Sequence, residues 1–136
     1  MASYADQGIV RFASPFPFDD TVQRLLATFA ERGIKVFATI DQQAQAIAVG
    51  LSLPPTTLIL FGNPSAGTPL MLDNRASGLD LPLKALVVEA EPDTVEVFIN
   101  AAKYVIDRHG LPHGLEANLL PVEQLIAHVL EVPGER

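Results

Sequence analysis

Hydrophobic and polar residues along this chain fall into segments of helical and of strand spacing. The clearest helical period runs from Asp19 or Asp20, either of which can cap a helix, to Gly33, which suits a left-handed helix end. Because apolar residues three and four positions apart share one face of a helix, this segment predicts an amphipathic helix with one buried stripe. That stripe consists of Val22, Leu25, Leu26, Phe29 and Ala30.

Other segments have the β-branched content or the alternation of β-strands. Residues 83–89 and 94–99 form the clearest antiparallel pair, because residues 90–93 between them have the length and composition of a hairpin loop. The run Thr56–Phe61 is apolar on both faces toward its end. This predicts an internal strand covered by helices on one side and by a partner on the other. Further strands are expected at 9–13 and 34–40.

Three more helices follow from capping residues and glycine stops. We expect them at 42–49, at 101–109 and from Pro121 onward. The pairs Asn63-Pro64 and Thr68-Pro69 could each begin a helix, and we predict a turn at the first and a short helix from Pro69 to Asn74.

The order β-α-β-α-β-(α)-β-β-α-α predicts the α+β class. The expected architecture is a mostly antiparallel sheet with amphipathic helices packed on one face.

Length and composition limit the class of protein. The 136 residues fit a single domain with its core at residues 8–131, and 49% hydrophobic residues exclude a disordered chain. A net charge of −7 argues against nucleic-acid binding, which requires clustered Lys and Arg. With no cysteine, disulfides and thiolate chemistry are excluded, and no residue pattern calls for a cofactor. Residues 133–136 are expected to fray.

Neither the start of the chain nor its apolar runs have the pattern of a targeting signal. Residues 1–8 are polar and contain Asp6, unlike a secretory signal, and no apolar run approaches the roughly 20 residues of a membrane helix. We expect a soluble, cytoplasmic protein with no membrane partner.

Several segments resemble a known family. The run from Gly50 to Met71, followed by the run from Leu79 to Lys84, is similar to the domain-of-unknown-function 302 family in a long and specific match. Tyr104 and the run from Arg108 to Leu111 also resemble that family's C-terminal helix end. The resemblance covers most of the chain, from Gly8 to Leu130.

The resemblance implies a compact α+β domain with a topology like that of the TATA-binding protein, often found as a homodimer. It brings no established reaction. The chain departs from the family's commonest pattern at Ser65, where a lysine is expected.

The loop from Gly62 to Pro69 is the densest group of special backbone residues. Such a loop either approaches a ligand closely or merely shapes a tight crossover between a strand and a helix. In the first case its amides would hold a small anionic ligand. The candidate ligand-binding residues here are Asn63, Ser65, Gly67 and Thr68.

Asp80, Lys84 and His109 are the remaining candidates. Asp80 and Lys84 flank Pro82, where they could form an ion pair or Lys84 could contact an acidic ligand. His109 is the candidate proton-transfer residue, with Asp107 and Glu116 as potential partners. His109 and His113 have zinc-like spacing, but Gly110 and Pro112 interrupt the helix between them, so no metal site is predicted.

These observations predict a non-enzymatic small-ligand-binding or interaction domain that acts as a homodimer through a sheet face its own helices leave uncovered. The alternative is an enzyme on a small acidic or carbonyl-containing metabolite, with His109 as acid/base and Lys84 as charge stabiliser. In both cases the site is expected where the Gly62–Pro69 loop, the Asp80–Lys84 segment and His109 converge.

Overall fold

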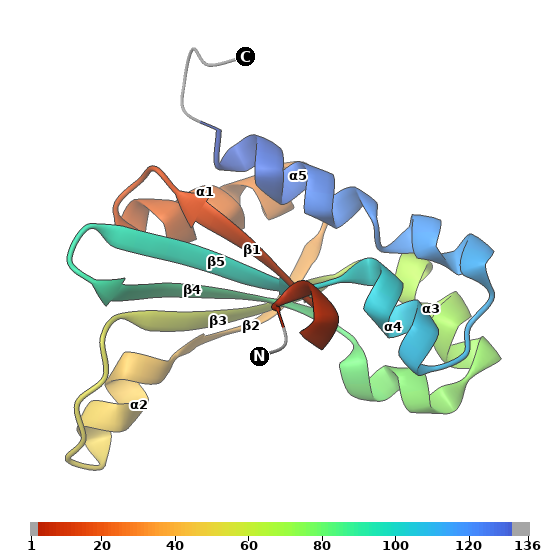
Figure 1. Cartoon of the computed structure of the whole chain (residues 1–136), viewed down its shortest axis with the longest axis horizontal. Helices are drawn as coiled ribbons and strands as arrows, with labels where there is room; N and C mark the ends of the chain where they lie inside the picture. The colour runs from red at the N-terminus through yellow and green to blue at the C-terminus, as the bar shows by residue number, and fades with distance from the viewer. Residues whose placement is uncertain (1–2, 132–136) are drawn as a thin grey trace.

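A computed structural model describes residues 3–131, so the expectation for residues 133–136 lies outside the described part of the chain. Five strands form one sheet in the order β1-β5-β4-β3-β2, and every pair of neighbours is antiparallel. Strand β4 is therefore the middle strand (Figure 1). The strands are β1 (Ile9–Ser14), β2 (Lys35–Asp41), β3 (Thr56–Gly62), β4 (Leu83–Glu91) and β5 (Thr94–Asn100).

Helices connect the strands. The α-helices are α1 (Phe18–Glu31), α2 (Gln42–Ala48), α3 (Pro64–Asp73), α4 (Ala102–Arg108) and α5 (Pro121–Val129). Three short 3-10 helices are η1 (Ala5–Gln7), η2 (Arg75–Asp80) and η3 (His113–Asn118). Figure 1 shows α2 at the end of the sheet that carries the β4–β5 turn, while α3, α4 and η3 lie at the opposite end.

One hydrophobic core lies between the sheet and four of the helices. Helices α1, α3, α4 and α5 all contribute buried apolar side chains to it, whereas α2 contributes none. From the sheet, alternate residues such as Ile59, Phe61, Ala85 and Val87 face this core, as the period of two requires. The α+β prediction, with a mostly antiparallel sheet and helices on one face, is confirmed.

The prediction for residues 63–74 was wrong. Helix α3 begins at Pro64, because the Asn63 side chain caps it by accepting a hydrogen bond from the Ser65 amide at 2.9 Å. Pro64 then occupies the first helical position, where its missing N–H costs nothing. Pro69, which we took as a helix start, lies inside α3. Of the two cap-and-proline pairs, the first starts the helix.

Candidate functional site

The start of α3 leaves no free amides for an anion. The Ser65 amide donates to the Asn63 side chain, and the amides of Ala66 and Gly67 both donate to the Asn63 carbonyl at 2.9 Å. These are the N–H groups that an anion at a helix start would use. The Gly62–Pro69 loop therefore fits the second of the two alternatives, a tight crossover between a strand and a helix. The geometry argues against the first, in which its amides would hold an anion.

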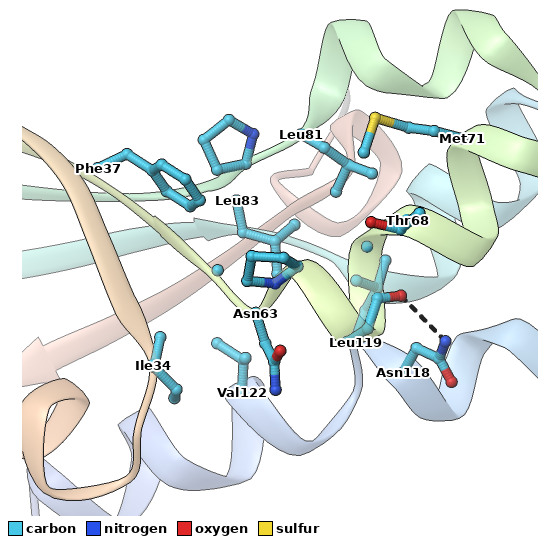
Figure 2. Close-up of a pocket in the computed structure, with 15 residues that line it drawn as sticks. Ile34, Phe37, Asn63, Thr68, Met71, Leu81, Leu83, Asn118, Leu119 and Val122 are labelled. Carbon is cyan, nitrogen blue, oxygen red and sulfur yellow. Dashed lines mark hydrogen bonds between the residues drawn. The ribbon is translucent and has the colours of Figure 1, made fainter.

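The same crossover forms one wall of an apolar pocket. This pocket has a volume of about 330 Å³ and lies between the end of β3, helix α3, the entrance to β4 and the start of α5 (Figure 2). No residue that lines it is charged. Its apolar lining consists of Ile34, Phe37, Pro64, Ala66, Met71, Leu81, Pro82, Leu83, Leu119 and Val122.

Three polar side chains complete the pocket lining. They are Asn63, Thr68 and Asn118, and together with Gly62 and Gly67 they account for the rest of the lining. The Asn118 amide nitrogen donates to the Ala66 carbonyl at 3.0 Å, which leaves its side-chain oxygen as an acceptor. A mostly apolar wall with a few hydrogen-bonding groups is typical of a small-molecule site.

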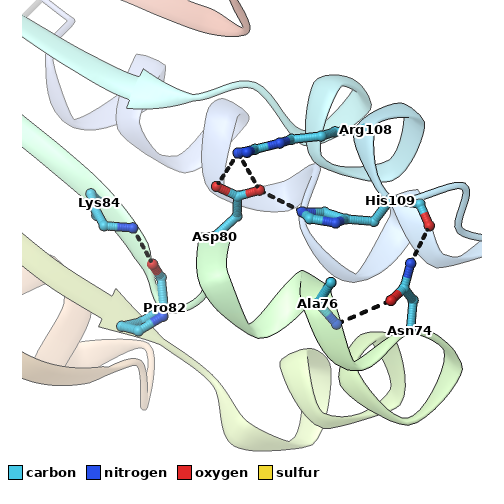
Figure 3. Close-up of polar contacts among 7 residues, drawn as sticks. All are labelled: Asn74, Ala76, Asp80, Pro82, Lys84, Arg108 and His109. Carbon is cyan, nitrogen blue, oxygen red and sulfur yellow. Dashed lines mark hydrogen bonds and ion pairs between the residues drawn. The ribbon is translucent and has the colours of Figure 1, made fainter.

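Asp80 and His109 meet, but outside this pocket. Nε2 of His109 lies 2.5 Å from the Asp80 carboxylate, and Arg108 donates to both oxygens of that carboxylate at 3.0 Å (Figure 3). The His109 side chain is only 7% exposed. Asn74 also donates to the His109 carbonyl at 2.8 Å. The cluster therefore ties η2 to the end of α4. The partners we considered, Lys84 for Asp80 and Asp107 or Glu116 for His109, were wrong.

Lys84 is not part of either arrangement. Leu83 and Ala85 are buried in the core, so the intervening Lys84 points to the other face of the sheet. Its ammonium donates to the Pro82 carbonyl at 3.2 Å, and its backbone amide donates to the side chain of Asn100. The expected convergence of loop, Lys84 and His109 is therefore wrong, because strand alternation separates Lys84 from the pocket.

Sequence reasoning found only part of the pocket. Asn63, Gly67 and Thr68 line it, whereas Ser65 does not. Met71, Asn118 and Val122 also line the pocket, and the sequence did not indicate them. Asn118 and Val122 are far from the loop in sequence. Asn118 lies in η3, which packs on α3, and Val122 lies in α5, so only the tertiary fold brings them to the pocket. Leu81, Pro82 and Leu83 lie within the Asp80–Lys84 segment that the sequence did single out, although its charged residues were named there and not these three.

Within residues 3–131, no group of three or more His, Asp or Glu side chains is placed to hold a metal ion. No helix in that part of the chain is long and apolar enough to cross a membrane.

The fold and the pocket define an α+β domain with an antiparallel sheet, one helix-covered face and a neutral cavity at one end. The chain belongs to the family described as "Domain of unknown function DUF302", whose model matches residues 10–131. It is similar to the crystal structure of an uncharacterised conserved DUF302 protein from Bacillus stearothermophilus, with a TM-score of 0.76 and 18% identity over 90% of this chain and 95% of that one. At that identity, the likeness concerns the fold.

Curated relatives are closer in sequence but longer. The chain is 42% identical over 111 residues to proteins named "Fluoride-specific ion channel FluC 1" from Brucella suis and from Brucella abortus. The match covers 82% of this chain but only 44% and 41%, respectively, of those proteins. The chain thus spans less than half the length of these relatives.

Proposed function

We propose that this domain binds a small, uncharged and largely apolar molecule in the pocket between α3, β4 and α5, and that it acts as a homodimer. The observation that carries the ligand proposal is the pocket itself. It offers apolar side chains on most of its surface, a few amide and hydroxyl groups, and no charge. Burying apolar ligand surface against such walls would supply most of the binding free energy.

The pocket's size limits the ligand. A volume of about 330 Å³ holds on the order of ten non-hydrogen atoms, at roughly 30 Å³ for each water-sized group. One polar group on the ligand can reach Thr68 or the free oxygen of Asn118, while the rest contacts residues such as Leu83 and Val122. A ring carrying one hydroxyl or amide group satisfies these conditions.

An anion is a poor fit to this pocket. It would need a cation or free N–H groups, because an unpaired charge taken out of water is costly. The amides of Ser65, Ala66 and Gly67 are already used, and the lining has no Lys, Arg or His. The pocket therefore supports a neutral ligand better than the anionic ligand expected from the sequence, or the fluoride in the names of the Brucella relatives.

The enzyme alternative receives less support from the geometry. It needs His109 and Lys84 beside one substrate, whereas His109 contacts Asp80 outside the pocket and Lys84 faces the opposite side of the sheet. His109 and Asp80 are better explained as a structural contact between η2 and α4.

A titration with two ligands of matched size tests the proposal. Benzyl alcohol is neutral and benzoate is anionic, and both are small enough for the pocket. In ¹H–¹⁵N correlation spectra, benzyl alcohol should shift the amide signals of Gly62, Gly67, Leu83 and Asn118 in a saturable way. The titration should extend to about 10 mM, because a Kd of 1 mM corresponds to only about −4 kcal/mol. Stronger binding of benzoate at the same residues would overturn the neutral-ligand proposal.

Gly67→Leu should fill the pocket without damaging the fold. A Cβ at this position would lie 3.8 Å from Leu81, which is ordinary van der Waals contact. Because Gly67 lies in α3, a better helix former there should add about 0.5–1 kcal/mol of stability. Benzyl alcohol affinity should fall at least about tenfold, since the side chain would occupy the space that the ligand requires.

Gly114→Leu is the matched control for this prediction. Gly114 lies in η3 outside the pocket, and a Cβ there would have no neighbour within 4 Å. This variant should bind benzyl alcohol as the wild type does. Equal affinity in Gly67→Leu and Gly114→Leu would show that the ligand binds elsewhere.

A further inference from the structure

The face of the sheet opposite the core is apolar at its centre, and no helix of the core packs on it. It also carries the ion pair between Arg11 of β1 and Glu96 of β5, and the Tyr4 ring beside η1 packs on Phe98. Residues directly opposite each other in an antiparallel ladder share a face, and the pairs Leu58 with Leu86 and Leu86 with Phe98 link three strands on this side. We call this surface the open face. Its apolar centre consists of Ile40, Leu58, Leu60, Leu86, Val88 and Phe98, all partly exposed.

Two opposite charges lie at the two ends of the central strand on the open face. Lys84 is opposite Leu60 at the start of β4, and Glu91 is opposite Thr94 at its end. Thr94 precedes the buried Val95, so it and Glu91 belong to the open face. Neither Lys84 nor Glu91 belongs to an ion pair in the part of the chain that the structure describes.

We propose that two copies of this chain pair by stacking their open faces, with the two β4 strands antiparallel across a twofold axis. This surface rests on the proposed homodimer and specifies how it forms. An axis that crosses β4 between Val87 and Val88 lies midway between Lys84 and Glu91. Lys84 of each copy then faces Glu91 of the other, and Val88 and Leu86 meet near the axis. On β5 the axis passes beside Glu96, which is opposite Val88, and each Glu96 keeps Arg11 of its own chain as its partner.

The arrangement satisfies the requirements of an isologous interface. Each twofold contact occurs twice, so one chain's own Lys84 and Glu91 provide two complementary charge pairs at the rim of an apolar centre. Sheets that stack in this way keep their strands within about 30° of each other. Lys84 at one end of β4 therefore stays close to Glu91 at the other end of the second copy's β4.

The size of the open face is also adequate. Five strands about 4.8 Å apart and seven residues rising about 3.3 Å each give a footprint of roughly 24 by 23 Å. Stacking two such faces would therefore bury on the order of 1,100 Å² of accessible surface in total. A specific interface needs at least about 1,000 Å² in total. The apolar centre covers only part of this footprint, because Arg11 of β1 and Glu96 of β5 lie on the same face.

On β3 the same axis falls between Thr56 and Thr57, which are opposite Val88 and Val87. It brings Leu60 of one copy toward the segment at Leu53 of the other. Leu51 and Leu53 are 67% and 36% exposed in the single chain. In this arrangement the second copy covers Leu53.

A charge swap tests this geometry. Sedimentation velocity over a concentration series should give the wild type twice the 14.6 kDa chain mass. Lys84→Glu and Glu91→Lys should each weaken dimerisation at least about tenfold, because each puts two like-charged pairs in the interface. The double variant Lys84→Glu/Glu91→Lys should recover most of the wild-type Kd. Arg75→Glu, in η2 away from the open face, is the control for the changed net charge and should leave the Kd unaltered.

The outcomes separate the surface from the homodimer itself. Thermal melting of each variant at low concentration first establishes that the monomer is folded. A wild type that stays monomeric would overturn both the homodimer and this surface. A dimer that Lys84→Glu and Leu86→Asp both leave intact would show that another surface pairs, and so would overturn only the open-face proposal. Single variants that weaken the dimer without rescue by the double swap would contradict the antiparallel stacking.

Discussion

Replacing Phe61 with alanine is expected to lower the free energy of unfolding by about 3–5 kcal/mol. Phe61 of β3 is fully buried and stacks on Phe29 of α1 with ring centroids 4.3 Å apart. The substitution removes apolar area from the core and leaves a cavity that the sheet backbone cannot close. It also removes an aromatic pair that adds about 0.5–1.5 kcal/mol beyond its area. Urea denaturation at neutral pH measures the loss.

Phe37→Ala is the matched control for Phe61→Ala. The two residues lie on neighbouring strands, but Phe37 is 46% exposed and lies at the rim of the pocket. Its truncation should cost well under half as much as that of Phe61, since little area is buried. Equal losses in the two variants would contradict the placement of the core.

Asp80→Ala should have the second largest effect, a loss of about 1–3 kcal/mol. The carboxylate accepts from Arg108 and lies 2.5 Å from the almost buried ring of His109. Its removal leaves the His109 nitrogen without this partner and releases the contact between η2 and α4. The Asp80 side chain is itself 20% exposed, so water screening holds the loss below that of a fully buried pair. Urea denaturation measures the change.

Hydrogen exchange gives the Asp80 prediction a local readout. Amides of η2 and α4 should exchange faster in Asp80→Ala, while those of β3 change only by the global loss of stability. Arg108→Gln should have a smaller effect, because Arg108 is 47% exposed and its loss keeps the contact between Asp80 and His109. If Asp80→Ala were as stable as the wild type, the cluster would have no structural role.

Much of the fold could be predicted because period and capping act locally. The apolar stripe of α1 is enough to predict that helix, and the alternation of apolar and polar residues is enough to predict β4 and β5. The short loop between β4 and β5 then indicates that the two strands pair as a hairpin. The prediction for residues 63–74 was wrong because Asn63-Pro64 and Thr68-Pro69 both have a capping residue followed by proline, so either pair could begin the helix. The end of the strand at Gly62 was foreseeable, but only the structure shows that Asn63, directly after it, caps α3.

The site was less predictable because it depends on packing between distant segments. Lys84 could have been assigned to the open face, since strand alternation beside a buried Leu83 requires it. The contact of Asp80 with His109 joins residues 29 positions apart, and no local pattern indicates it. The contribution of Asn118 and Val122 to the pocket likewise depends on where η3 and α5 pack.

Intermolecular nuclear Overhauser effects between benzyl alcohol and the methyl groups of the protein test the central claim most directly. If the pocket between α3, β4 and α5 is the binding site, the ring protons should give contacts to Met71, Leu81, Leu83 and Val122. Contacts confined to Leu58 and Leu86 on the open face, or none at saturating ligand, would contradict the proposed site.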